Sequence, residues 1–199
     1  MRGPFHAIMG PINDAVVKKL TYKTVRLLSP HLREGERVLD IGCGFGYQMH
    51  MLQKSMHVSI EGIDVVDYHE ADMPMKKFDG VSIPYPDKAF DASYLAFVLH
   101  HAERPVDLLH DAMRVSKHRV IIIEDTPRNG FDRNFDRLHG WMFNRYYHLD
   151  HQCVFRSVEE WHKIFDSLGI KKVQTVRLSR WVREPYFPIS RTTFVLDVT

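Results

Sequence analysis

The chain has 199 residues, of which 44% are hydrophobic and 26% are charged, and this is the composition of one globular domain with a full core. A formal net charge of +2, with the 13 histidines counted as neutral, excludes the global basic field that drives binding to nucleic acid or to anionic membranes. Two cysteines, Cys43 and Cys153, give no disulfide framework, and there is neither an apolar leader nor a run of about 18 apolar residues, so we expect a cytoplasmic protein in a reducing compartment.

The first 35 residues predict an arm followed by a helix. Residues 1–13 contain two prolines and two glycines, which argues against regular structure. From Asp14 the apolar residues recur every three or four positions, as on one face of a helix. Ser29 and Pro30 should interrupt it, because the residue before a proline avoids the α region.

Strands then alternate with helices, which favours a doubly wound α/β sheet. The apolar run Val120 to Ile123 is continuous, as expected for a strand covered on both faces. Strands are predicted over residues 37–41, 58–63, 76–78, 90–97, 120–123, 172–178 and 192–198, and helices over 47–54, from 105 to 115 and from 157 to 168. The last of these helices has a capping box, Ser157 with Glu160, and Gly169 closes it.

Residues 126–156 form an insert. Apolar side chains are spaced by three or four positions and predict an extra helix: Phe131, Phe135, Leu138, Met142, Tyr146 and Leu149. Arginines and aromatic residues between them suit a cap over an aromatic or anionic small molecule. The alternative is a helix that packs its apolar stripe on the core and solvates its charges, and for each single arginine we favour that alternative.

The sequence VLDIGCGFG, residues 38–46, carries the main functional signal. A short apolar run ends at Asp40 and breaks into glycines at positions 42, 44 and 46. Glycines at alternate positions allow positive φ and remove Cβ atoms, so a ligand can lie on the backbone where the next helix begins. Asp64 ends the second predicted strand, 22 residues after Gly42, where it can accept hydrogen bonds from ribose hydroxyls. Alone, Asp64 would be interpreted as a strand-ending or N-cap carboxylate.

A series of motifs resembles the class I S-adenosylmethionine-dependent methyltransferases of the small-molecule type: VLDIGCGFG, then GID, then DGVSIPYPDKAFD, then VLHH. The resemblance implies a single domain over residues 1–199 with a Rossmann-like, seven-stranded, mostly parallel sheet and an antiparallel last strand. A nicotinamide-binding loop would instead favour GxGxxG.

The resemblance also implies roles for individual residues. Asp40 would organise the loop near the methionine ammonium, Asp64 would hold the ribose hydroxyls, Asp79 would accept from the adenine amino group, and His100 would lie at the methionine end. The cofactor-binding set is Asp40, Gly42, Cys43, Gly44, Asp64, Val65, Asp79, Gly80, Phe97 and His100. Only 15 residues separate Asp64 from Asp79, so the second helix of the family is curtailed here.

Methyl transfer from a sulfonium is an in-line displacement, so the enzyme mainly aligns the nucleophile and excludes water. Where the nucleophile carries a proton, a histidine or carboxylate can remove it. The candidates are His100, His101, Asp125 and His139, each with the alternative of a hydrogen-bonded or solvated side chain. No metal is expected, because the cluster His148, Asp150 and His151 has no further spaced ligand.

The expected function is methyl transfer from S-adenosylmethionine to a small molecule, with S-adenosylhomocysteine as product. RNA or protein methylation is an alternative, although the segment LAFVLHH lacks the NPPY-like signature of nucleobase-amine methyltransferases. A further alternative is a regulatory protein that binds the cofactor without turnover. We expect a monomer or homodimer that binds no membrane and no nucleic acid, with Trp181, Tyr186 and Phe187 at the pocket mouth or a dimer contact.

Overall fold

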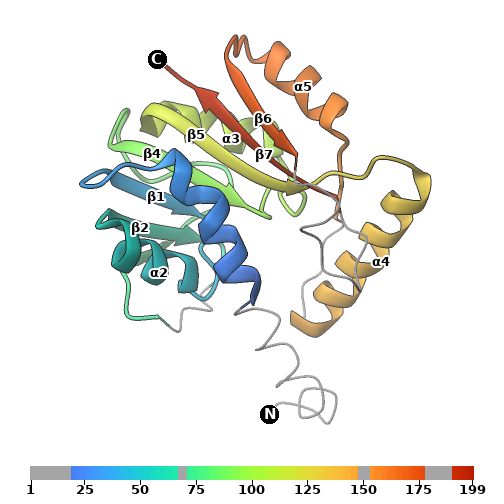
Figure 1. Ribbon diagram of the computed structural model, residues 1–199, viewed down its shortest axis with the longest axis horizontal. Helices are drawn as coiled ribbons and strands as arrows, with labels where there is room; N and C mark the ends of the chain where they lie inside the picture. The colour runs from blue at the N-terminus through green and yellow to red at the C-terminus, as the bar shows by residue number, and fades with distance from the viewer. Residues whose placement is uncertain (1–18, 67–70, 148–152, 178–189) are drawn as a thin grey trace.

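The fold is built on one seven-stranded sheet with the strand order β3-β2-β1-β4-β5-β7-β6 (Figure 1). The computed structural model describes residues 19–66, 71–147, 153–177 and 190–199. Strands β1 to β5 pair in parallel, and β7 runs antiparallel to both of its neighbours, β5 and β6. The predicted fold class, a mostly parallel doubly wound sheet with an antiparallel last strand, is confirmed.

The elements lie close to their predicted positions. The strands are β1 (Arg37–Ile41), β2 (Ser59–Asp64), β3 (Met75–Lys77), β4 (Phe90–Ala96), β5 (Ser116–Asp125), β6 (Val173–Arg177) and β7 (Arg191–Asp197). The helices are η1 (Ser29–His31), α2 (Tyr47–Met56), α3 (Pro105–Val115), α4 (Gly130–Tyr147) and α5 (Val158–Ser167), preceded by a helix whose described part is residues 19–28. The capping box of Ser157 and Glu160 begins α5 as predicted.

Strand β5 is longer than the apolar run that predicts it. It begins four residues earlier, at Ser116, which pairs with Phe90 of β4. The Arg119 guanidinium in this polar part binds the Glu36 carboxylate and the carbonyl of His31. The continuous apolar run therefore marks only the part of the strand that is covered on both faces.

Two apolar cores cover the two faces of the sheet. One contains the inward side chains of α3 and α5, including Leu109, Trp161 and Phe165. The other contains those of α2 and of the helix 19–28, including Leu28 and Leu52. Figure 1 shows these pairs of helices on opposite sides of the strands, with α4 beyond the end of β5. The carboxyl ends of the parallel strands are therefore left uncovered by the two helical layers, and a ligand can reach them.

Several sequence predictions fall outside the described residues. These are the arm over residues 1–13, the cluster of His148, Asp150 and His151, and the aromatic residues Trp181, Tyr186 and Phe187. Among the helices that are described, none has the length and apolar character needed to cross a bilayer.

The insert forms helix α4 as predicted, but two of the three stripe residues whose side chains the structure describes, Phe131 and Leu138, face solvent, while Phe135 is half-buried. Phe131 is 71% exposed and Leu138 is 54% exposed, whereas Asp132 and Asp136 are buried. Asp132, Asp136 and Gly140 are spaced by four residues and therefore share the face that turns inward. Gly140 on that face packs against Cys153 and Phe155, so the inward face of α4 buries two carboxylates beside side chains from the segment that follows the helix.

Candidate functional site

The glycine loop turns sharply at the end of β1. The amides of Gly42 and Cys43 both donate to the carbonyl of Ile63, which ties the loop to the end of β2. Gly42 has φ +80°, and a Cβ atom there would stand 2.4 Å from Cγ2 of Val98. Only glycine fits this position, because both the backbone angle and the space exclude a side chain.

Gly44 and Asp64 face each other across this edge of the sheet. The Gly44 amide donates to Oδ2 of Asp64 at 2.8 Å, and the Val66 amide donates to Oδ1 at 3.1 Å. Burial raises the pKa of Asp64, although these backbone donors favour the charged form. Nothing lies within 4 Å of the place where a Cβ of Gly44 would stand, so the loop leaves open space over its backbone. This space is the cradle that a nucleoside-bearing ligand requires.

Asp40 lies in β1, two residues before Gly42. Its carboxylate is buried and accepts a hydrogen bond of 2.5 Å from the Tyr94 hydroxyl. Burial raises the pKa of Asp40 to about 8, against the Tyr94 hydrogen bond, and the nearby Asp64 carboxylate raises it further. Asp40 does not line the cavity described below, and its described hydrogen bond joins β1 to β4.

Asp79 and Gly80 form a tight turn after β3. The Asp79 Oδ1 atom accepts from the amides of Val81 at 2.8 Å and Ser82 at 2.6 Å, and these bonds lower the pKa of this exposed carboxyl. Gly80 has φ +86°. Asp79 and Gly80 line the same cavity as Gly42 and Gly44 of the glycine loop.

One cavity of about 550 Å³ brings these features together. Nine of the ten predicted cofactor-binding residues line it: Gly42, Cys43, Gly44, Asp64, Val65, Asp79, Gly80, Phe97 and His100. Three of the four predicted catalytic candidates line it as well, His100, His101 and Asp125, whereas the side chain of His139 is outside the described part of α4. Leu20, Thr21, Gly140 and Phe155 also line it, and sequence reasoning did not find them because they come from distant segments.

Glu124 holds the turn that follows β4. Its Oε1 atom accepts from the Leu99 amide at 2.8 Å, and its Oε2 atom lies 2.6 Å from Nδ1 of His100. Burial works to lower the pKa of His100, but the charge and hydrogen bond of Glu124 raise it above its ordinary value. The His100 ring also stacks on Phe155, with ring centroids 4.6 Å apart. The carboxylate of Glu124 therefore fixes the His100 ring at the cavity wall and favours its charged form.

Phe97 and Asp125 meet the end of β7. Phe97 has φ +62°, a conformation that is costly for a residue with a large side chain and that is typical of functional sites. The Arg191 guanidinium lies 4.2 Å from the centre of its ring and donates from Nε to Oδ1 of Asp125 at 2.9 Å. The cavity wall therefore carries a neutralised ion pair beside an aromatic ring.

Asp136 is a buried carboxylate that sequence reasoning missed. It is 1% exposed, and neither of its oxygens has a hydrogen-bond partner within the described structure. Burial raises its pKa to about 7, and the charges of Asp125 and Asp132 raise it further, against His100 and Arg191. The signal in the sequence was the spacing of Asp132, Asp136 and Gly140 on one helical face.

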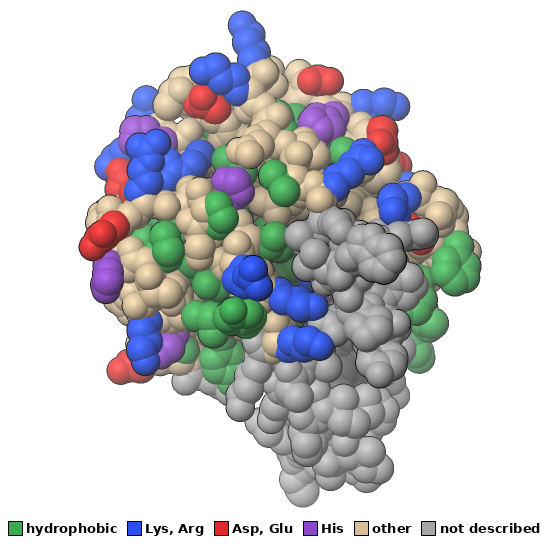
Figure 2. Space-filling view, in the orientation of Figure 1, with side chains coloured by type: hydrophobic (Ala, Val, Ile, Leu, Met, Phe, Trp, Pro, Cys, Tyr) green, Lys and Arg blue, Asp and Glu red, His purple; other side chains and the backbone are tan. Residues whose placement is uncertain are grey.

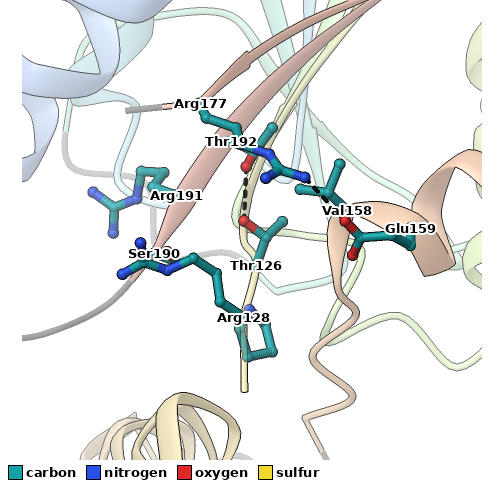
Figure 3. A pocket seen from close by; sticks show the side chains of 9 residues that line it. Thr126, Arg128, Val158, Glu159, Arg177, Ser190, Arg191 and Thr192 are labelled. Atoms are coloured by element: carbon teal, nitrogen blue, oxygen red, sulfur yellow. Dashed lines mark hydrogen bonds and ion pairs between the residues drawn. The ribbon is translucent and has the colours of Figure 1, made fainter. Parts of the chain in front are cut away.

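A smaller cavity of about 240 Å³ lies between the ends of β5, β6 and β7 and the start of α5 (Figure 3). The hydroxyls of Thr126 and Thr192 are 2.7 Å apart there. Its arginines are each paired with a carboxylate: Arg128 with Asp132, Arg177 with Glu159, and Arg191 with Asp125. The three arginines at this cavity are therefore held by carboxylates within the described structure.

Comparison with known proteins agrees with the geometry. Residues 16–175 match a protein family described as the methyltransferase domain. The chain belongs to the methyltransferase domain family. Its fold and cofactor class are those of the class I S-adenosylmethionine-dependent methyltransferases, as the motifs predict.

Individual relatives of this methyltransferase differ in what they act on. Demethylmenaquinone methyltransferase of Tropheryma whipplei is 27% identical over 169 residues, which cover 73% of this chain and 70% of the relative. The tRNA U34 carboxymethyltransferase of Nautilia profundicola is 27% identical over 124 residues, 55% of this chain but only 40% of the relative. Geranyl diphosphate C-methyltransferase of Streptomyces coelicolor, solved with S-adenosyl-L-homocysteine, shares 16% identity and the fold, with a TM-score of 0.67 over 92% of this chain and 80% of that one.

Proposed function

We propose that this methyltransferase transfers a methyl group from S-adenosylmethionine to a small, largely apolar molecule. The observation that carries the proposal is the composition of the 550 Å³ cavity: beyond the loop and carboxylates, its wall is mainly apolar and aromatic, with Phe45, Tyr47, Phe78, Val98 and Phe155 among the lining residues. A cavity of this size and lining suits a small ligand better than a polymer.

The cofactor would occupy the end of the cavity at the glycine loop. Asp64 has lone pairs left after accepting two amides, and these suit the two ribose hydroxyls. The turn at Asp79 and Gly80 suits the adenine end, and the open space over Gly44 suits the methionine end. S-adenosylmethionine supplies an activated methyl group on a sulfonium.

The acceptor would lie on the side of the cavity that contains His100, Asp125 and Phe155. His100 and Phe155 form a stacked wall that orients a flat acceptor and excludes water, as an in-line displacement requires. Asp125 accepts a hydrogen bond from Arg191, which fixes the position of its carboxylate at the cavity wall. The protein would thus mainly align the acceptor with the methyl group. The Asp125 carboxylate is the nearby group for an acceptor that must lose a proton.

Methylation of RNA is the second candidate, and the relatives that modify tRNA U34 favour it. The net charge of +2 argues against it, because RNA binding requires a cationic surface.

Ligand-induced stabilisation tests the cofactor part of the proposal. At a concentration 100-fold above the dissociation constant, S-adenosylhomocysteine should stabilise the protein by about 2.7 kcal/mol, which raises the Tm by roughly 5–10 °C. Asp64→Ala should lose most of this shift, while Asp91→Ala, which alters a carboxylate bound to Arg37 and Lys117 on the sheet, should keep it. An unchanged Tm for the unmodified protein would refute cofactor binding.

A further inference from the structure

The outward face of α4 exposes three large apolar side chains and one arginine, with the neutral Asn134 between them. Phe131, Leu138 and Trp141 are 71%, 54% and 64% exposed. At 3.6 residues per turn these three side chains, with Arg137, occupy about one third of the circumference of the helix and extend over about 15 Å. Figure 2 shows hydrophobic side chains along the right-hand edge of the molecule, over α4.

The charges of α4 are separated between its two faces. Both acidic residues of the helix, Asp132 and Asp136, are buried on the inward face. Arg137 is exposed on the outward face and forms no ion pair with any residue that the structure describes. The outward face therefore has a positive charge among apolar side chains and no exposed acid in the described part of the helix.

We propose that the outward face of α4, defined by Phe131, Arg137, Leu138 and Trp141, docks on the surface of a bilayer that contains anionic lipid. Phe, Leu and Trp beside an arginine are the composition of helices that lie in the plane of a membrane interface. Anionic headgroups complement the arginine, and the tryptophan suits the boundary between headgroups and acyl chains. This surface is separate from the proposed function, because its four side chains are exposed to solvent, whereas the α4 residue that lines the cavity, Gly140, is buried.

A second copy of the chain fits the face less well. The three side chains expose roughly 400 Å², about half of what one partner contributes to a stable dimer. A two-fold contact centred on this face would also bring two Arg137 side chains together. The global charge of +2 and the lack of a long apolar run in the sequence predict no membrane partner, but an interfacial helix requires neither a basic protein nor a spanning segment.

Vesicle flotation with the full chain tests the proposal. Vesicles of phosphatidylcholine with about 30% phosphatidylglycerol should carry the protein, and pure phosphatidylcholine should carry it several-fold less, since one arginine near an anionic surface contributes about fivefold. The variant with Phe131→Ser, Leu138→Ser and Trp141→Ser should bind at least about tenfold more weakly. Arg137→Glu should reduce binding to the anionic vesicles only.

Controls separate docking from folding and from self-association. Val106→Ser changes an exposed valine of α3 and should leave flotation unchanged. The triple variant should keep its far-UV circular dichroism and its Tm shift with S-adenosylhomocysteine. The proposal is overturned if the unmodified protein does not float with anionic vesicles, if the triple variant floats equally, or if the triple substitution dissolves a dimer in light scattering while flotation persists.

Discussion

Replacing Asp136 by Asn should remove a pH-dependent loss of stability. The folded state holds the proton of Asp136 up to a pKa of about 7, whereas the unfolded chain releases it near the ordinary value of 3.8. The folded state therefore binds more protons between these values, and its stability falls as the pH rises from about 4 to about 7. Asparagine cannot ionise, so the stability of the Asp136→Asn variant should not show this decrease with rising pH.

The magnitude follows from the shift of the pKa. A difference of about three pKa units corresponds to about 4 kcal/mol at full burial. The helix lies at the molecular surface, and screening by nearby solvent reduces this to about 2 kcal/mol. Between pH 5 and pH 8 the unmodified protein should lose about 1–2 kcal/mol more than the variant does, which is a difference of roughly 0.5–1 M in urea midpoint.

Urea unfolding followed by circular dichroism at pH 5 and pH 8 measures this difference. Asp132→Asn is the matched control, one turn earlier on α4, where the carboxylate is paired with Arg128 and its loss should destabilise at both pH values. If the free energy of unfolding changed with pH by the same amount in the unmodified protein and in Asp136→Asn, the claim that an unpartnered carboxylate is buried at this position would be refuted.

Three further outcomes are expected. Gly42→Ala should destabilise the protein by about 2–4 kcal/mol in urea unfolding, because the added Cβ meets Val98 and φ is positive. It should also abolish the Tm shift with S-adenosylhomocysteine, and a normal Tm shift would contradict the claim that the ligand lies on the glycine loop. Tyr94→Phe should cost about 1–3 kcal/mol in the same assay by leaving Asp40 without its donor, and an unchanged midpoint would argue against that bond. Glu124→Gln should lower the pKa of the histidine it contacts, as NMR titration would detect, and an unchanged titration would argue against the pair.

The strands and the glycine loop could be predicted because their signals are local. An apolar run that ends in a carboxylate and breaks into glycines specifies a strand and a tight turn within ten residues. The predicted bounds of β1, residues 37–41, are those observed. Nine of the ten predicted cofactor residues line one cavity because the carboxyl ends of parallel strands meet at one edge.

The insert could be predicted only as a helix, because its orientation depends on distant partners. The period of its apolar residues identifies an amphipathic helix but not the face that packs inward. The inward face of α4 meets Arg191 from β7 and the segment at Phe155, and Arg133 bridges to Glu160 of α5. These partners are up to 55 residues away, so the burial of Asp136 cannot be read from its neighbours.

Transfer of a labelled methyl group tests the central claim most directly. The purified protein is incubated with methyl-labelled S-adenosylmethionine and a cell extract separated into small molecules, RNA and protein, with Asp64→Ala as the matched control. We predict that label appears in a small, solvent-extractable molecule with a mass gain of one methyl group, and that the variant transfers little. Label in RNA or protein alone, or label that stays in the donor while S-adenosylhomocysteine still binds, would contradict the proposed function.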